Sequence, residues 1–359
     1  MNGTHRAIVR ADGTLSVARR PTIAPGPGEL SVAALYAGLC GTDIQMLRGL
    51  RDDPAPVIGH EGIARVTAAG AGVPEAFAPG TLVAVNPTHP TDPSFLMGHN
   101  VDGLLQERTL LPRTAVTGGL VLPLPEATDV TLAPLLEPLA VVRYALDALA
   151  AFHPATLLVV GDGVVGHLAV RAAQRWLGAG VHVALVHHTE RGRAFSVACA
   201  YPGDLMLDGG PAAVWDGPVA ALLATPRDAT VAALESALAA GADVVDIVGG
   251  LPPGAATPLL PGVDLTAVRS ANCGGLPDPV HVTTAGQVRL FGHRGVANRH
   301  LREAASELAR EPGRYRDLIT HEYDLDGAAS VMRALARSRE RTVDGRRLIK
   351  LSIRITGED

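Results

Sequence analysis

Four side chains that can bind a divalent metal ion occur in three short segments of the first 140 residues. Cys40 begins the segment Cys-Gly-Thr-Asp, His60 and Glu61 form the centre of Gly-His-Glu-Gly, and Glu137 lies in Leu-Glu-Pro-Leu. A thiolate, an imidazole and carboxylates suit a borderline-soft metal such as zinc. Three protein ligands with one exchangeable position are typical of catalytic zinc, so the set predicts a metal site that performs chemistry.

Each of these residues also has an ordinary structural interpretation when it is taken alone. A single cysteine such as Cys40 is more often a small buried apolar side chain than a ligand. His60 could be a hydrogen-bonded histidine of the core. The metal-site interpretation therefore depends on the whole set of residues.

A glycine-rich segment, Gly-Asp-Gly-Val-Val-Gly at 161–166, follows an apolar run at 155–160 and precedes an amphipathic segment at 167–176. In a dinucleotide-binding turn the first glycine permits a tight turn, the second lets the backbone approach the pyrophosphate, and the third packs the helix on the strand. The following helix start offers free N–H groups to phosphates. An ordinary glycine turn is the alternative. The expected cofactor contacts are Gly161, Gly163, Val164, Val165, Gly166 and, after a later strand, Val248.

The residues after the second predicted strand, at 181–186, bear on the choice of cofactor. A carboxylate at the end of this strand would bond the ribose 2′-hydroxyl of NAD, whereas arginine pairs with the 2′-phosphate of NADP. No carboxylate ends the strand directly, so NADP(H) is favoured over NAD(H). The arginines could instead be solvated charges, and Glu190 could still reach a ribose hydroxyl. The candidate contacts are His188, Thr189, Arg191 and Arg193.

The elements that must position these residues fall into two patterns. Residues 1–35 and 57–90 alternate apolar and polar positions between glycine and proline turns, which predicts a β-rich region. From residue 155 strands and helices alternate, as in a doubly wound parallel sheet of the α/β class. Residues 250–280 give no clear assignment. Further predicted elements are helices at 131–151, 299–311 and 325–338 and strands at 244–248 and 348–354.

The bulk composition is that of a globular protein with two domains. A chain of 359 residues exceeds the usual size of a single core. The net charge of −5 gives no reason to expect nucleic acid or an anionic membrane as a partner. Three cysteines argue against a disulfide framework. Because residues 1–6 lack an apolar signal core and no run of 18 apolar residues occurs, we expect a cytoplasmic protein.

Taken in order, these motifs resemble the medium-chain dehydrogenase/reductase family, in its zinc-dependent alcohol and polyol dehydrogenase branch that includes sorbitol dehydrogenase. Pro-Gly-Pro-Gly-Glu at 25–29 and Leu-Ile-Thr-His at 318–321 resemble further segments of the family. The resemblance implies a GroES-like β-rich catalytic domain (1–152 and 292–359) and an inserted Rossmann domain (153–291), with the active site in the cleft between them. It also implies a homodimer or homotetramer and a small-molecule substrate.

The resemblance assigns roles to the matching positions. Cys40 and His60 would ligate catalytic zinc, and Glu61 and Glu137 would compete for the remaining positions. Asp43 would orient the ligating histidine from outside the ligand set. Thr42 would hydrogen-bond the substrate oxygen and start a proton relay.

This sequence departs from the family pattern at two places. The stretch 86–97 contains no cysteine, so the structural zinc of many family members is not expected. Gln45 stands where many members have the histidine that ends the proton relay, so protons would leave through water, His99 or another group.

Two loops give the expected substrate contacts, His99 with Asn100 and His293 with Arg294. Such side chains would suit a polyhydroxylated or anionic substrate, although they could also be plain loop residues or cofactor contacts. The sequence therefore predicts zinc-dependent hydride transfer between a nicotinamide cofactor and a secondary alcohol or ketone, such as a polyol, sugar or cyclitol. A zinc-free NADPH-dependent reductase of the same fold and a non-catalytic nucleotide-binding protein are the alternatives.

Overall fold

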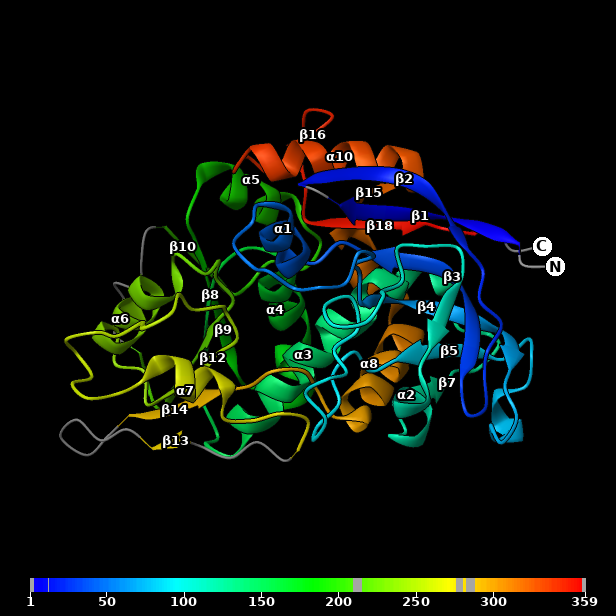
Figure 1. Cartoon of the computed structure of the whole chain (residues 1–359). Helices are drawn as coiled ribbons and strands as arrows, with labels where there is room; N and C mark the ends of the chain where they lie inside the picture. Colours follow the sequence, from blue (N-terminus) through cyan, green and yellow to red (C-terminus); the bar gives the residue numbers. More distant parts are fainter. Residues whose placement is uncertain (1–2, 12, 209–214, 276–279, 282–287, 357–359) are drawn as a thin grey trace. The chain divides into compact units, whose positions relative to one another are not determined.

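The structure is a computed structural model that describes residues 3–11, 13–208, 215–275, 280–281 and 288–356 (Figure 1). The chain forms two compact units, which are described separately below. Unit 1 consists of Met1–Glu137, Ala305–Pro312 and Ile319–Asp359, and unit 2 of Pro138–Ala304 and Gly313–Leu318. These limits differ from the expected boundaries near 152 and 292, because α3 (Ala133–Ala150) and α8 (Asn298–Arg310) each contribute residues to both units.

Unit 1 is built on a seven-stranded sheet in the order β15-β18-β3-β4-β5-β7, with β6 paired to β3. The central strand β3 is almost wholly buried, which explains its run of small and branched apolar residues. A separate hairpin is formed by β1 and β2. The strands of unit 1 are β1 (Thr4–Ala11), β2 (Thr14–Pro21), β3 (Leu30–Gly38), β4 (Glu61–Ala69), β5 (Leu82–Val85), β6 (Thr109–Leu111), β7 (Val121–Pro123), β15 (Ile319–Tyr323), β16 (Thr342–Val343), β17 (Arg346–Arg347) and β18 (Lys350–Arg354).

The C-terminal helix α10 (Leu325–Arg337) fixes the helix that follows β3. Its buried residues recur at helical spacing, which gives one apolar face. It contacts β2 and α1 (Gly41–Leu47), both of which lie far earlier in the chain (Figure 1). Arg48, at the end of α1, donates to the Leu335 carbonyl through Nη2 at 2.8 Å. The other helices of unit 1 are α2 (Arg113–Thr117), η1 (Glu75–Phe77) and η2 (Val130–Leu132).

Unit 2 has a seven-stranded sheet in the order β10-β9-β8-β11-β12-β14-β13. All of its pairs are parallel except β13 with β14. This order, in which β8 lies between β9 and β11 and helices connect the parallel strands, confirms the predicted Rossmann sheet. Its elements are β8 (Thr156–Val160), α4 (Val164–Leu177), β9 (His182–His187), α5 (Glu190–Ala198), β10 (Leu205–Asp208), β11 (Val219–Leu223), α6 (Thr230–Ala239), β12 (Val244–Ile247), α7 (Leu265–Ser270), β13 (Val280–His281), β14 (Arg289–Gly292), α9 (Pro312–Tyr315) and η3 (Arg316–Leu318).

Among the residues that the structure describes, we find no helix with the length and apolar character needed to cross a membrane.

Candidate active site

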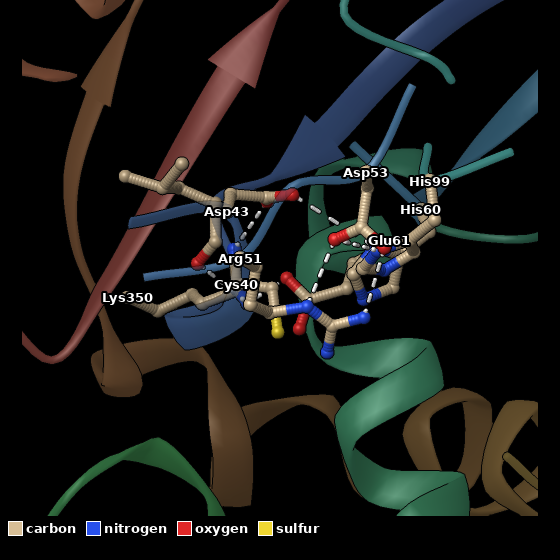
Figure 2. Close-up of polar contacts among 9 residues, drawn as sticks. Cys40, Asp43, Arg51, Asp53, His60, Glu61, His99 and Lys350 are labelled. Carbon is tan, nitrogen blue, oxygen red and sulfur yellow. Dashed lines mark hydrogen bonds and ion pairs between the residues drawn. The ribbon is translucent and has the colours of Figure 1, made fainter. Parts of the chain in front are cut away.

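The pairing of β3 with β4 brings the predicted metal ligands together. In this antiparallel pair Gly38, the last residue of β3, lies opposite Glu61, the first residue of β4. Cys40 follows β3 by two residues and His60 precedes β4 by one, so both lie at the same end of the pair. One ligand atom from each of Cys40, His60 and Glu61 lies within 4.8 Å of the others (Figure 2).

The three-residue set is largely buried and has the donor chemistry of a zinc site. His60 is 8% and Glu61 2% exposed, and Cys40 is partly exposed. Burial lowers the pKa of His60, but the neighbouring Cys40 and Asp43 raise it well above its ordinary value. The His60 Nδ1 and Thr42 Oγ1 atoms are buried and have no hydrogen-bond partner within the described residues. Such atoms are unusual in native proteins unless a ligand or water satisfies them, so the set fits a bound metal and its substrate.

Asp43 acts on Cys40 more directly than on His60. Its Oδ2 accepts a hydrogen bond of 2.9 Å from the Cys40 backbone N–H, as the third residue of a helix does in a capping box. Its Oδ1 lies 3.9 Å from His60 Nδ1, which is too far for a hydrogen bond. Burial raises the pKa of Asp43, and His60 opposes this rise. The carboxylate therefore fixes the backbone of Cys40 and interacts with His60 only electrostatically.

Glu61 is held by Lys350, the only lysine in the chain. Lys350 Nζ forms a buried ion pair with Glu61 Oε2 and lies 3.3 Å from the carbonyl oxygen of Leu39 (Figure 2). A Cβ atom at Gly38 would lie 2.6 Å from Lys350 Cε and 2.8 Å from Glu61 Oε2, so a glycine is needed there. Lys350 was not among the site residues predicted from the sequence. Its uniqueness in an arginine-rich chain was the available signal.

Glu137, on α3, is not part of the three-residue set. It is partly exposed, and its neighbourhood contains His60 and Glu61. Burial raises the pKa of Glu137 to about 7, with Glu61 adding to the rise and His60 opposing it. Of the two carboxylates expected to compete for the metal, only Glu61 therefore lies with Cys40 and His60 in this structure.

The glycine-rich turn of unit 2 has the geometry that a dinucleotide-binding turn requires. Gly161 has φ +113°, and a Cβ there would lie 2.5 Å from the carbonyl oxygen of Ala224. A Cβ at Gly166 would lie 1.8 Å from the Gly161 carbonyl oxygen, so this glycine allows α4 to pack on the turn. Gly163 precedes α4 with open space around it and no side-chain cap. The N–H groups at the start of α4 can therefore donate hydrogen bonds to phosphate oxygens.

Comparisons with known proteins show what parts of the chain are similar to. Residues 26–121 match the family model of the alcohol dehydrogenase GroES-like domain. The chain is 32% identical to glucose 1-dehydrogenase of Thermoproteus tenax over 189 residues. This alignment covers 46% of this chain and 53% of that protein. The chain spans about half the length of the curated relatives it matches.

The fold recurs over whole chains in solved structures. A protein described as a zinc-binding dehydrogenase, from Sinorhizobium meliloti and bound to NADP, has a TM-score of 0.73 at 22% identity, over 98% of this chain and 99% of that one. Galactitol-1-phosphate dehydrogenase from Escherichia coli has a TM-score of 0.72 at 18% identity, over 97% of this chain and 99% of that one. The whole chain therefore has the fold of these dehydrogenases, and residues 26–121 carry the GroES-like domain. The matched residues lie in unit 1, and unit 2 forms the Rossmann sheet described above.

His99 lies beside the metal set of unit 1. Its ring centroid is 5.2 Å from that of His60, and its Nδ1 lies 3.2 Å from Asp53 Oδ2 (Figure 2). Burial lowers the pKa of His99 to about 4. The adjacent Asn100 is exposed and donates to the Pro93 carbonyl at 2.8 Å. His99 was predicted from the sequence, whereas Asp53 was not. The only signal for Asp53 is a short charged stretch after α1.

The second pair of predicted substrate residues belongs to unit 2. His293 is 3% exposed and its ring centroid lies 4.4 Å from that of Tyr144. Its Nε2 lies 3.6 Å from Asp246 Oδ1, and burial lowers the pKa of His293 to about 3. Arg294 is exposed. His293 therefore forms part of a buried ring cluster within unit 2.

The predicted cofactor contacts beyond β9 lie at the start of α5. Thr189 caps this helix and accepts from Gly192 N–H at 3.1 Å, and His188 and Arg191 are exposed. Arg193 Nε lies 3.3 Å from Asp208 Oδ2. Val248, which follows β12, is partly exposed, and its carbonyl oxygen accepts from Arg269 Nε at 3.1 Å.

Proposed function

We propose that this chain is a zinc-dependent oxidoreductase that transfers hydride between a secondary alcohol or ketone and a nicotinamide cofactor. The observation that carries the proposal is the convergence of Cys40, His60 and Glu61 within 4.8 Å at one end of the β3–β4 pair. The relatives named above include dehydrogenases of a sugar and of a polyol phosphate, which supports a polyol, sugar or cyclitol as substrate.

Cys40 and His60 would hold the zinc ion, with Glu61 beside them. When bound, zinc supplies a Lewis acid that lowers the pKa of a hydroxyl group. Lys350 offsets the charge of Glu61, so the donor set keeps less negative charge than its ligands alone would carry. Thr42 follows Cys40 by two residues, and its buried hydroxyl has both a donor and free acceptor positions. This hydroxyl can hold the substrate oxygen by a hydrogen bond and relay its proton, because it can pass its own proton to a water molecule as it receives the one from the substrate.

We further propose that NADP(H) is preferred over NAD(H). β9 ends at the buried His187, whose Nε2 bonds Ser196 Oγ at 2.8 Å, and no carboxylate stands at this strand end. Arg191, which is exposed at the start of α5, is the candidate for a 2′-phosphate. A homodimer or homotetramer stays a prediction from the family resemblance.

The test combines metal analysis with a turnover screen. Zinc per chain is measured after gentle purification, and absorbance at 340 nm is followed with both cofactors against polyols, cyclitols and amino-alcohols. Cys40→Ser should lose zinc and activity but keep cofactor affinity. Cys199→Ser, a partly exposed cysteine of unit 2, is the matched control and should keep all three.

Three results would contradict the proposal. Less than about one-half zinc per chain would favour a zinc-free reductase. Cofactor binding without turnover of any carbonyl or alcohol would favour a non-catalytic nucleotide-binding protein. Wild-type activity of Cys40→Ser would remove the assigned metal ligand.

A further inference from the structure

A second polar group, made of Arg51, Asp53 and His99, lies next to the metal set on unit 1 and is here called the loop cluster. Arg51 donates to Asp53 through Nε at 2.8 Å and through Nη2 at 3.1 Å, which is a bidentate pair (Figure 2). Asp53 Oδ2 also lies 3.2 Å from His99 Nδ1. Because the His99 ring contacts that of His60, the loop cluster adjoins a proposed metal ligand.

The loop that carries this cluster is held in place by backbone contacts. Arg10, on β1, hydrogen-bonds the Asp53 carbonyl and also reaches the Ala55 carbonyl at 3.3 Å. The Ala55 N–H donates to the carbonyl of His99 at 2.8 Å. The loops that carry Asp53 and His99 are therefore joined to each other and to β1, so the cluster is formed before any substrate binds.

The charges of the cluster suit a hydroxyl group better than an anion. Burial raises the pKa of Asp53, but the hydrogen bonds with Arg51 and His99 lower it by more, so the pKa is below its ordinary value. The carboxylate therefore stays ionised. The Arg51 and Asp53 charges then cancel within their bidentate pair. Arg51 keeps N–H donors that Asp53 does not use, and Asp53 keeps acceptor capacity. A substrate hydroxyl group can accept a hydrogen bond from Arg51 and donate one to Asp53. An anionic substrate group would instead be repelled by the Asp53 carboxylate.

The two side chains are also accessible. The Arg51 side chain is 28% and the Asp53 side chain 15% exposed, while His99 behind them is 5% exposed. A substrate placed at the metal set could reach Arg51 and Asp53 without displacing His99.

We propose that Arg51 and Asp53 bind the hydroxyl group on the carbon next to the reacting one, so that the site selects vicinal diols and polyols over simple alcohols. This inference rests on the proposed dehydrogenase function and assigns its specificity. A site that hydrogen-bonds a substrate hydroxyl discriminates against the analogue that lacks it, because the polar groups of the site are then left unpaired.

The experiment compares 2,3-butanediol with 2-butanol, which share a carbon skeleton, in the zinc-loaded enzyme at saturating cofactor. The wild type should favour the diol. Asp53→Asn should lower kcat/KM for the diol roughly ten- to hundredfold, mainly through KM, and change that for 2-butanol less than about threefold. Arg51→Met should act in the same direction. Asp52→Asn is the matched control, because it removes the same charge from an exposed neighbour, and it should change neither value.

The outcomes separate this inference from the proposed function. An equal loss on both alcohols would overturn the inference and show that the cluster only supports the loop. Unchanged diol kinetics in Asp53→Asn, or a wild type that oxidises 2-butanol as well as the diol, would overturn it while leaving the dehydrogenase function intact. Turnover of neither alcohol nor of any polyol by the zinc-loaded enzyme would refute the proposed function itself. Circular dichroism and cofactor affinity equal to wild type establish that each variant is folded.

Discussion

Removing the charge of Lys350 should destabilise unit 1 strongly. Lys350 is 1% and Glu61 2% exposed, so water cannot solvate either charge when its partner is lost. Lys350→Met keeps most of the apolar stem and leaves the Glu61 carboxylate buried without its cation. Leaving one member of a buried ion pair uncompensated costs about 3–5 kcal/mol. The expected result is a loss of this size in the free energy of unfolding.

Urea unfolding of the metal-free protein measures this loss. With an m-value of about 2 kcal/mol per molar, the midpoint should fall by about 1.5–2.5 M. Far-UV circular dichroism reports on the whole chain, whereas both tryptophans, Trp176 and Trp215, lie in unit 2. Their fluorescence therefore reports the unfolding of unit 2, which does not contain the Lys350–Glu61 ion pair. Arg6→Met is the control, because it breaks the exposed pair with Asp326 and should cost at most about 1 kcal/mol.

A double variant separates charge from packing. Lys350→Met combined with Glu61→Gln removes both charges and should recover most of the lost stability. A double variant as unstable as the single one would refute the electrostatic explanation and indicate lost packing. A single variant whose midpoint stays within about 0.5 M of wild type would refute the reasoning altogether.

Three further predictions concern unit 2. Gly166→Ala should cost about 1–3 kcal/mol in urea unfolding, because its Cβ would lie 1.8 Å from the Gly161 carbonyl oxygen; Gly163→Ala should keep wild-type stability and only weaken cofactor binding. Burial raises the pKa of Asp246 to about 7, so the native state keeps a proton that the unfolded chain releases above about pH 4. The wild type should therefore lose free energy of unfolding as the pH rises from about 4 to about 7, and Asp246→Asn should gain about 1.4 kcal/mol per pH unit relative to it. Urea unfolding at several pH values measures this difference, and profiles that run parallel for the two proteins would contradict the prediction. Arg191→Gln should raise the Kd for NADPH at least about fivefold in a fluorescence titration and leave that for NADH within about twofold.

The elements of unit 2 were predictable because their signals are local. The apolar run that ends at Val160 is followed by glycines and an amphipathic segment, and it became β8, the turn and α4. The Cys-x-x-Asp spacing at Cys40 is likewise local, and it is the spacing of a capping box. It explains why Asp43 bonds the Cys40 backbone, whereas the family resemblance had suggested that it orients His60.

The ion pair of Glu61 with Lys350 could not be predicted, because the two residues are 289 positions apart. They meet because β4 and β18 flank the same strand, β3, where Gly38 pairs with Glu61 on one side and with Ser352 on the other. Only the register of both pairs, together with the missing side chain at Gly38, brings the two charges together. No periodicity in the sequence records this arrangement.

The burial of the only lysine also determines how the protein responds to amine-directed reagents. Apart from the histidines, every other basic side chain is an arginine. Arginine does not react with acylating reagents at neutral pH because its pKa exceeds about 12. Acylation of a lysine side chain in this chain therefore requires unit 1 to open at β18. The rate at which Lys350 is acylated thus reports the opening of the metal set directly, without an introduced probe.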